Sequence, residues 1–267
     1  MKSRILVAAV GVPVLAWVVL GAPAFVMAFA LMVLSGVGAV ELQRCVSGEN
    51  WNTVSLLSML SAVSTVTWYY NGGEQIAASF LAFALVFFVY AIVRAGEVKF
   101  RQIMAGLFGS IAIGWSFSAF LRMEASGIHR AYLLLPFLLS FACDTFAFFA
   151  GKALGRHKLA PKVSPHKTVE GSVGGLAGNL VCGLLFAFVM DRWFGGSIGY
   201  GAMAVMALLC GVVAQIGDLS FSLIKREFGI KDYGHLFLEH GGVLDRFDSV
   251  LFVTPVVELV FWFAAEI

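Results

Sequence analysis

Nine stretches of this chain are almost free of charged residues, and each is about long enough to cross a lipid bilayer. A hydrocarbon core of about 30 Å is spanned by roughly 20 helical residues, because each residue adds 1.5 Å. The stretches cover residues 5–20, 24–40, 53–69, 76–93, 103–121, 131–150, 172–190, 200–224 and 249–265. The sequence therefore predicts an all-α polytopic membrane protein with about nine transmembrane helices.

The composition agrees with this fold class and excludes several others. Hydrophobic residues make up 60% of the 267 residues and charged residues 13%, and the mean hydropathy is +0.90. A soluble domain needs more polar residues than this to cover its surface. The four cysteines form no C-x-x-C pair, so we expect neither a disulfide framework nor a thiol metal site. A net charge of +2 without a basic tract argues against nucleic acid as a partner.

The basic residues predict how the chain is oriented in the membrane. With nine spans and a cytoplasmic N-terminus, 15 of the 18 Lys and Arg residues fall on the inner side. A cleaved signal peptide is the other interpretation of the first stretch, and this distribution argues against it. We expect a single integral membrane domain, in which residues 1–130 form N-terminal helices and residues 131–267 carry two long cytoplasmic loops, 151–171 and 225–248.

The second of these loops and its flanks contain a dense set of acids and cations. If the eighth stretch is helical, Asp218, Ser222 and Lys225 lie at i, i+4 and i+7 on one face. Asp245 and Asp248, at i and i+3, share a face where the ninth stretch begins. Acids are costly in or near hydrocarbon and are retained mostly for function.

This combination of side chains favours a site for phosphates and a hard cation. Mg²⁺ prefers oxygen ligands and takes one or two carboxylates together with substrate phosphates. We expect Asp218, Asp245 and Asp248 to bind one or two cations. The cations expected to neutralise phosphate charge are Lys225, Arg226, Lys231 and Arg246.

A glycine pair precedes the ninth stretch and offers a second way to bind phosphate. Gly241 and Gly242 allow the backbone to approach a ligand, with N–H groups at the positive end of a helix. His240, next to the pair, is expected to donate to substrate. Zinc is not expected, because His235 and His240 have no Cys or His partner at ligand spacing.

The first loop supplies further candidates. Lys167 and Glu170 stand at a predicted helix start with Thr168 as its N-cap, where a cation and an acid suit a phosphate and its metal. Asp144 lies inside the sixth stretch and is expected to face the interior of the helix bundle. A face with glycine at 171, 174, 175 and 178 predicts close helix packing rather than a ligand site.

Three motifs in these segments resemble those of phosphatidate cytidylyltransferases. The pattern S-x-I-K-R-x4-K-D-x-G-x5-H-G-G-x2-D-R-x-D runs from Ser222 to Asp248 and includes Asp232 and Gly234. The pattern S-P-x-K-T-x-E-G begins at Ser164, and Q-x-G-D begins at Gln215. The length and the many apolar stretches are also similar to that family.

The resemblance implies a Mg²⁺-dependent membrane enzyme that converts CTP and phosphatidic acid to CDP-diacylglycerol and pyrophosphate. It also implies a site at the cytoplasmic face of a bacterial inner membrane, a homodimer, and metal-associated roles for the acids at 218, 245 and 248. The remaining candidates would then bind substrate: Asp144, Lys167, Glu170, Ser222, Lys231, Asp232, His240, Gly241, Gly242 and Arg246.

Two other functions are compatible with parts of the pattern. A CTP-dependent membrane lipid kinase would need similar residues at the same face. A cation-coupled transporter would account for Asp144, Asp218 and Glu258, but it predicts polar residues through the middle of the membrane, whereas here they gather at one end. A CDP-alcohol phosphotransferase is disfavoured, because its D-G-x2-A-R-x8-G-x3-D-x3-D pattern is missing.

Overall fold

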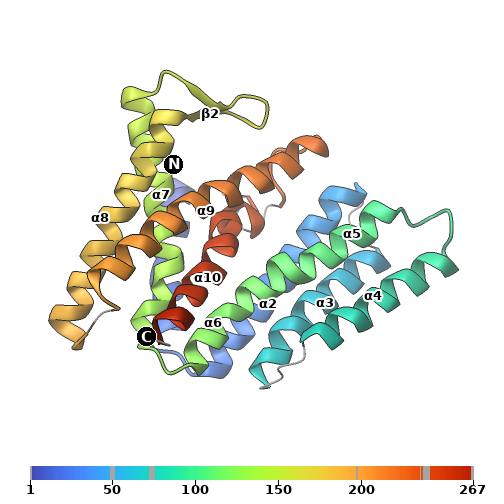
Figure 1. Ribbon diagram of the computed structural model, residues 1–267. Helices are drawn as coiled ribbons and strands as arrows, with labels where there is room; N and C mark the ends of the chain where they lie inside the picture. The colour runs from blue at the N-terminus through green and yellow to red at the C-terminus, as the bar shows by residue number, and fades with distance from the viewer. Residues whose placement is uncertain are drawn as a thin grey trace. The chain divides into compact units, whose positions relative to one another are not determined.

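The computed structural model describes residues 2–48, 52–71, 76–196, 198–234, 236 and 241–265 (Figure 1). Most of these residues are helical, and the helix Phe100–Ala125 contains a π-helical turn, η1. The helices are α1 (Lys2–Leu20), α2 (Ala24–Ser47), α3 (Thr53–Tyr70), α4 (Ile76–Val93), α5 (Phe100–Gly109), η1 (Ser110–Trp115), α6 (Ser116–Ala125), η2 (Arg130–Leu134), α7 (Leu135–Leu154), α8 (Val169–Phe194), α9 (Tyr200–Glu227) and α10 (Leu244–Ala265).

Each apolar stretch predicted from the sequence coincides with one helix, except that residues 103–121 cover α5, η1 and α6, and residues 131–150 cover η2 and α7. Five helices among the described residues are long and apolar enough to cross a membrane: Ala24–Ser47, Phe100–Ala125, Arg130–Leu154, Val169–Phe194 and Tyr200–Glu227. Large apolar side chains such as Val89 and Leu185 are more than half exposed, as lipid-facing side chains would be. The prediction of a polytopic, mainly helical membrane protein is confirmed at this level, and the number of crossings stays a prediction.

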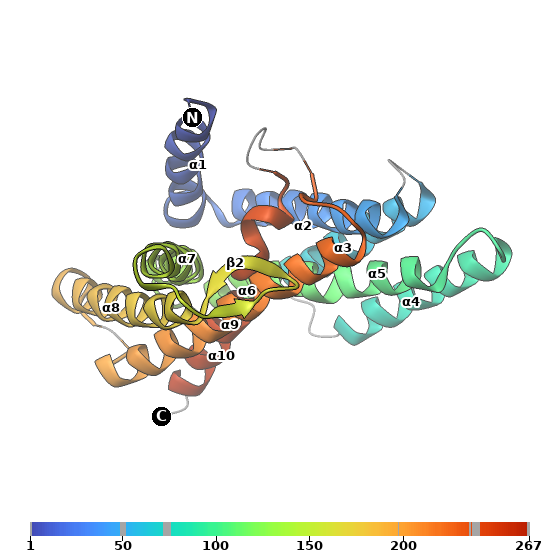
Figure 2. The ribbon, with the colours of Figure 1, turned by 90° about the horizontal axis from the view of Figure 1, so that it is seen from above.

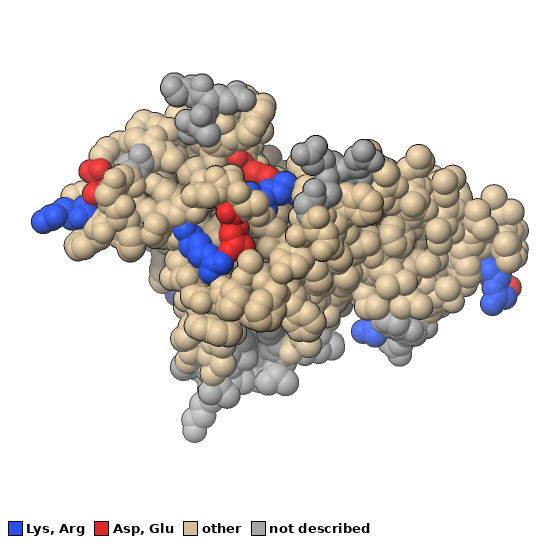
Figure 3. Space-filling view, turned by 90° about the horizontal axis from the view of Figure 1, so that it is seen from below, with Lys and Arg blue, Asp and Glu red and all other residues tan. Residues whose placement is uncertain are grey.

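The surface agrees with this assignment. In the view of Figure 3, Lys, Arg, Asp and Glu appear only as small groups on an otherwise uncharged surface. Some of the charged side chains pair with each other, as Arg130 does with Glu124.

The loop after α7 departs from the purely helical prediction. Strand β1 (Lys158–Ala160) pairs antiparallel with β2 (Ser164–Thr168), so the loop is a short hairpin. Thr168 ends β2 and begins α8 as its N-cap, because its Oγ1 accepts a hydrogen bond from the N–H of Gly171 at 3.1 Å. The predicted N-cap is therefore confirmed, and the hairpin was not foreseen.

The contacts divide the chain into two compact units. Unit 1 comprises Met1–Ala131 and Glu227–Phe247, and unit 2 comprises Tyr132–Arg226 and Asp248–Ile267. In unit 1, α3 lies close to α2 and to the long α5–α6 helix (Figure 2). Small residues allow this approach, since a Cβ on Gly114 would lie 2.8 Å from the carbonyl oxygen of Ala62. The prediction of one domain is not tested by this division.

Unit 2 is built on the side-by-side pair α7 and α8 (Figure 1). The glycine face of α8 makes this packing possible: a Cβ on Gly171 would lie 2.8 Å from the carbonyl oxygen of Ala147, and one on Gly175 2.9 Å from that of Cys143. Close helix packing at these glycines is as predicted. Helix α9 packs on α8 in the same manner, because a Cβ on Gly211 would lie 2.8 Å from Leu176.

Candidate active site

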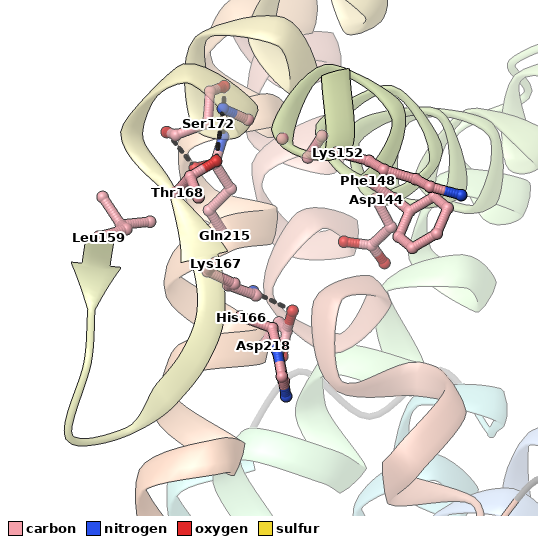
Figure 4. A pocket seen from close by; sticks show the side chains of 13 residues that line it. Asp144, Phe148, Lys152, Leu159, His166, Lys167, Thr168, Ser172, Gln215 and Asp218 are labelled. Carbon is pink, nitrogen blue, oxygen red and sulfur yellow. Dashed lines mark hydrogen bonds and ion pairs between the residues drawn. The ribbon is translucent and has the colours of Figure 1, made fainter. Parts of the chain in front are cut away.

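Unit 2 contains a cavity of about 400 Å³ between α7, the hairpin, α8 and α9 (Figure 4). This volume is within the range of small-molecule sites. The lining combines acids, cations and small residues: Asp144, Ala147, Phe148, Gly151, Lys152, Leu159, His166, Lys167, Thr168, Gly171, Ser172, Gln215 and Asp218. Three consecutive segments, the end of α7, the hairpin and the start of α8, thus form one pocket together with the later helix α9.

An ion pair between Lys167 and Asp218 lies in this pocket. The Nζ of Lys167, on β2, donates to Oδ2 of Asp218, on α9, and the dashed line in Figure 4 marks the contact. The Oγ of Ser222 donates to Oδ1 of the same carboxylate at 3.3 Å. Asp218 and Ser222 therefore share a face of α9, as their spacing predicts, and both side chains of the ion pair are about a quarter exposed. They remain accessible to a ligand.

Helix α8 and helix α9 are tied together beside this ion pair. The Oγ of Ser172 donates to the side-chain oxygen of Gln215, and the Nε2 of Gln215 donates back to the carbonyl oxygen of Ser172 at 3.2 Å. Because these reciprocal bonds lie one turn before Asp218, they fix the position of α9 relative to the start of α8.

Asp248 lies on α10 at its junction with α9. A Cβ on Gly217 would lie 2.8 Å from the carbonyl oxygen of Asp248, so the two backbones touch next to Asp218. Asp248 precedes the apolar stretch 249–265. Desolvation raises the pKa of the Asp248 carboxyl to about 7, and repulsion from the carboxylates of Asp218 and Asp144 adds to the increase. Three acids of unit 2 are thus close enough to interact electrostatically.

These acids suit a cation that brings other ligands with it. Among the described residues, no three His, Cys, Asp or Glu side chains are grouped so that they could hold a metal ion by themselves. Mg²⁺ does not require one, because it is commonly held by one or two carboxylates and by substrate phosphates. The neighbouring carboxylates of Asp218 and Asp248 are compatible with this mode of binding.

Asp245 belongs to unit 1 and has different partners. Its Oδ2 accepts hydrogen bonds from the N–H groups of Tyr233, at 2.8 Å, and Gly242, at 3.0 Å. The N–H groups of Val243 and Leu244 donate to the carboxylate of Glu41. The three N–H groups at the start of α10 are therefore already bonded to carboxylates. A phosphate would therefore have to displace these acids, and phosphate binding at Gly241 and Gly242 stays a prediction.

The other predicted residues are not among those that line the cavity, and His240 lies outside the described residues. Glu170 turns to the chain before the hairpin, where it accepts hydrogen bonds from the N–H groups of Arg156, at 3.0 Å, and His157, at 3.2 Å. Exposed positions are found for Arg226, Lys231, Asp232 and Arg246. Lys225 is half-buried, and Arg226 donates to the carbonyl oxygen of Val163 at 3.4 Å.

Three residues that line the cavity or bind the start of α10 were not singled out from the sequence. Lys152 and His166 line the cavity, and Glu41 binds the start of α10. His166 could have been found, because it sits between Pro165 and Lys167 in a motif already identified. Glu41 gave no comparable signal, since its partners are about 200 residues away in the sequence.

Comparison of the sequence with known protein families identifies the class of protein to which this chain belongs. The model of the cytidylyltransferase family matches residues 2–264. The chain therefore belongs to the cytidylyltransferase family.

Individual relatives share a more particular name. A phosphatidate cytidylyltransferase of Staphylococcus saprophyticus is 34% identical over 181 residues, which cover 68% of this chain and 67% of the relative. One from Staphylococcus aureus strain COL is 35% identical over the same length. A third, from Staphylococcus epidermidis, is 28% identical over 265 residues, 97% of this chain and 98% of the relative. The similarity thus extends through both units.

Proposed function

We propose that this chain transfers the cytidylyl group of CTP to phosphatidic acid and releases pyrophosphate. The observation that carries the proposal is the family match across residues 2–264, together with relatives whose name states this activity. The polar cavity around Lys167 and Asp218 supports it, because both substrates are polyanions that need cations and an accessible pocket.

The reaction requires positioning and charge neutralisation more than covalent chemistry by the protein. A phosphate oxygen of phosphatidic acid attacks the α-phosphorus of CTP, and the bond from that phosphorus to the bridging oxygen of the β-phosphate breaks. Pyrophosphate leaves with the bond electrons. The attacking phosphate is already ionised at neutral pH, so no strong general base is needed.

Side chains of the cavity would supply the charge. Lys167 can exchange its bond to Asp218 for a substrate phosphate, since both partners are accessible. Lys152 and His166 line the same cavity and can donate to phosphate oxygens. The other candidates for neutralising phosphate charge remain Lys225, Arg226, Lys231 and Arg246. Further candidates for substrate binding are Ser222, Asp232, Glu170 and Asp144.

Asp218 and Asp248 are the residues that would hold Mg²⁺ in unit 2, and Asp245 stays a predicted ligand of one or two cations. Bound Mg²⁺ would neutralise charge that develops on the phosphates during transfer. The protein's part is to keep the carboxylates and the basic residues at fixed distances from the reacting phosphorus. Such fixed electrostatics can account for a large part of catalysis.

The placement in the membrane belongs to the same proposal. Nine spans with a cytoplasmic N-terminus would put the hairpin and the loop 225–248 at the cytoplasmic face of the bacterial inner membrane. The acyl chains of phosphatidic acid could then remain in hydrocarbon while its headgroup enters the cavity. A homodimer is expected from the family resemblance.

The fate of labelled CTP tests the proposal. Protein purified in detergent is incubated with Mg²⁺, phosphatidic acid and CTP labelled either in the cytosine or at the γ-phosphate. We expect the cytosine label in lipid and the γ-label in pyrophosphate. Transfer of the γ-label to lipid would instead establish a lipid kinase, and cation flux in proteoliposomes without any lipid product would establish a transporter.

A further inference from the structure

Glu41 is a buried acid that the proposed reaction has not used. It lies near the end of α2, only 4% of it is exposed, and a buried carboxylate is costly unless it is well hydrogen-bonded. Its Oε1 accepts from the N–H of Val243 at 3.0 Å, and its Oε2 accepts from the N–H of Leu244 at 2.9 Å. Both oxygens are therefore committed to the first turn of α10.

This contact supplies a cap that α10 cannot make for itself. The residue before the helix is Val243, which has no side-chain oxygen to accept the N–H groups of the first turn. A carboxylate at this end also interacts favourably with the helix dipole. Leu244 is fully buried, and its side chain lies 3.2 Å from where a Cβ on Gly38 would be, one turn before Glu41 on α2. Helix α2 thus contacts the start of α10 at Gly38 and again, one turn later, at Glu41.

The same carboxylate also fixes the chain that leads into α10. A Cβ on Gly242 would overlap the Glu41 carboxylate, and one on Gly234 would lie 2.5 Å from its Oε1. A side chain at either position would therefore displace the Glu41 carboxylate from its present place. Asp245 completes the arrangement, because its Oδ2 joins the N–H groups of Tyr233 and Gly242.

We propose that Glu41 is a positioning residue for the transfer reaction, which fixes the backbone around Gly234 and Gly242 and thereby the carboxylate of Asp245. The inference rests on the proposed function, in which Asp245 serves the cation and the phosphates. Glu41 touches no substrate in this scheme and acts through the segment that it holds.

Hydrogen exchange of the cation-free protein tests the contact directly. Glu41→Gln keeps the size of the side chain but turns an amide group toward one of the two N–H donors. We expect the amides of Val243 and Leu244 to exchange about tenfold faster or more, because a charge-assisted hydrogen bond is lost. Glu124→Gln is the matched control, since it removes a partly buried carboxylate of unit 1 that pairs with Arg130 instead. Unchanged exchange in Glu41→Gln would overturn the proposal.

Kinetics then separate positioning from a purely structural role. In Glu41→Gln we expect kcat to fall about 10- to 100-fold and the Mg²⁺ concentration for half-maximal activity to rise. Misplacement of the Asp245 carboxylate by a fraction of an ångström would weaken both catalysis and Mg²⁺ binding. A smaller folded fraction would lower the apparent kcat without moving the Mg²⁺ requirement. Faster exchange with an unchanged Mg²⁺ requirement would reduce Glu41 to a helix cap and refute the proposal.

A second variant covers the case in which Glu41→Gln does not fold. Glu41→Asp keeps the charge but is one methylene shorter, so it should retain part of the protection and of the Mg²⁺ affinity. Wild-type-like behaviour in both measurements would contradict the proposal. Failure of the wild type to move cytosine label into lipid would refute the proposed function and, with it, the role of Glu41 in transfer. The contact between Glu41 and α10 would still be tested, because the exchange measurement needs no substrate.

Discussion

Two acids of unit 1, Glu41 and Asp245, differ from Asp218 of unit 2 in what they bind. In unit 1, Glu41 and Asp245 accept hydrogen bonds from backbone N–H groups, so their carboxylates hold the chain in one conformation. In unit 2, Asp218 pairs with the side chains of Lys167 and Ser222 beside an open cavity. Backbone partners cannot leave without local unfolding, whereas side-chain partners can be exchanged for a ligand.

This difference predicts two kinds of mutational effect. Removing the carboxylate of Asp218, or that of Asp248 beside it, should reduce activity while the protein stays folded. Removing that of Glu41 or Asp245 should alter the local backbone first and activity as a consequence. The predictions below are ordered by the size of the expected effect, and each could break this distinction.

The largest effect is expected for Asp248→Asn. If Asp248 holds the cation as proposed, we expect kcat to fall about 1,000-fold, with little change in the thermal unfolding temperature. Turnover of labelled CTP and thermal unfolding in detergent are the measurements. Asp191→Asn, an exposed acid of α8 in the same unit, is the control. Near-normal turnover in Asp248→Asn would remove Asp248 from the metal site.

Lys167→Met should have the next largest effect. The substitution keeps an unbranched side chain but removes the cation that pairs with Asp218, so we expect the KM for CTP to rise and kcat/KM to fall about 100-fold. Steady-state kinetics at saturating Mg²⁺ would measure this. Lys162→Met, in the turn of the same hairpin, should behave like the wild type. Equal losses in both variants would show that only the general charge of the hairpin matters.

Gly242→Ala tests the backbone-holding role of unit 1. The added methyl group would overlap the Glu41 carboxylate, so we expect roughly a tenfold loss of turnover with faster amide exchange at Val243. Shortening the acid makes room for the methyl group. The double variant Glu41→Asp with Gly242→Ala should therefore lose less than the product of the two single effects. If the loss in the double variant equals the product of the two single losses, Glu41 and Gly242 do not interact in solution.

The helical arrangement could be predicted from the sequence to a large extent. Long charge-free stretches have one stable form in a bilayer, so the helix positions follow from hydropathy alone. The glycine face of α8 could be assigned to packing, because its spacing repeats with the helical period. Asp218 and Ser222 were correctly placed on one face for the same reason.

What the sequence could not show were partners brought together only by tertiary structure. Glu41 caps a helix that begins about 200 residues later, and Glu170 turns to the chain before the hairpin instead of the cavity. The N–H groups around Gly242 were expected to be open because a helix start has no partners of its own. A distant acid satisfies them, and no local pattern records this.

The smallest effect is expected for Thr168→Ala, which tests the comparison from the opposite side. Thr168 belongs to unit 2 and lines the cavity, yet its Oγ1 binds a backbone N–H, that of Gly171. If the type of partner decides the effect, this variant should lose stability of about 1 kcal/mol through the missing N-cap, while kcat/KM changes less than about threefold. Thermal unfolding in detergent and turnover measured on the same sample would separate the two quantities. Thr168→Ser retains the hydroxyl and should restore the stability. A large loss of activity in Thr168→Ala, reversed in Thr168→Ser, would instead mean that the hydroxyl meets the substrate, and position in the cavity would then matter more than the type of partner.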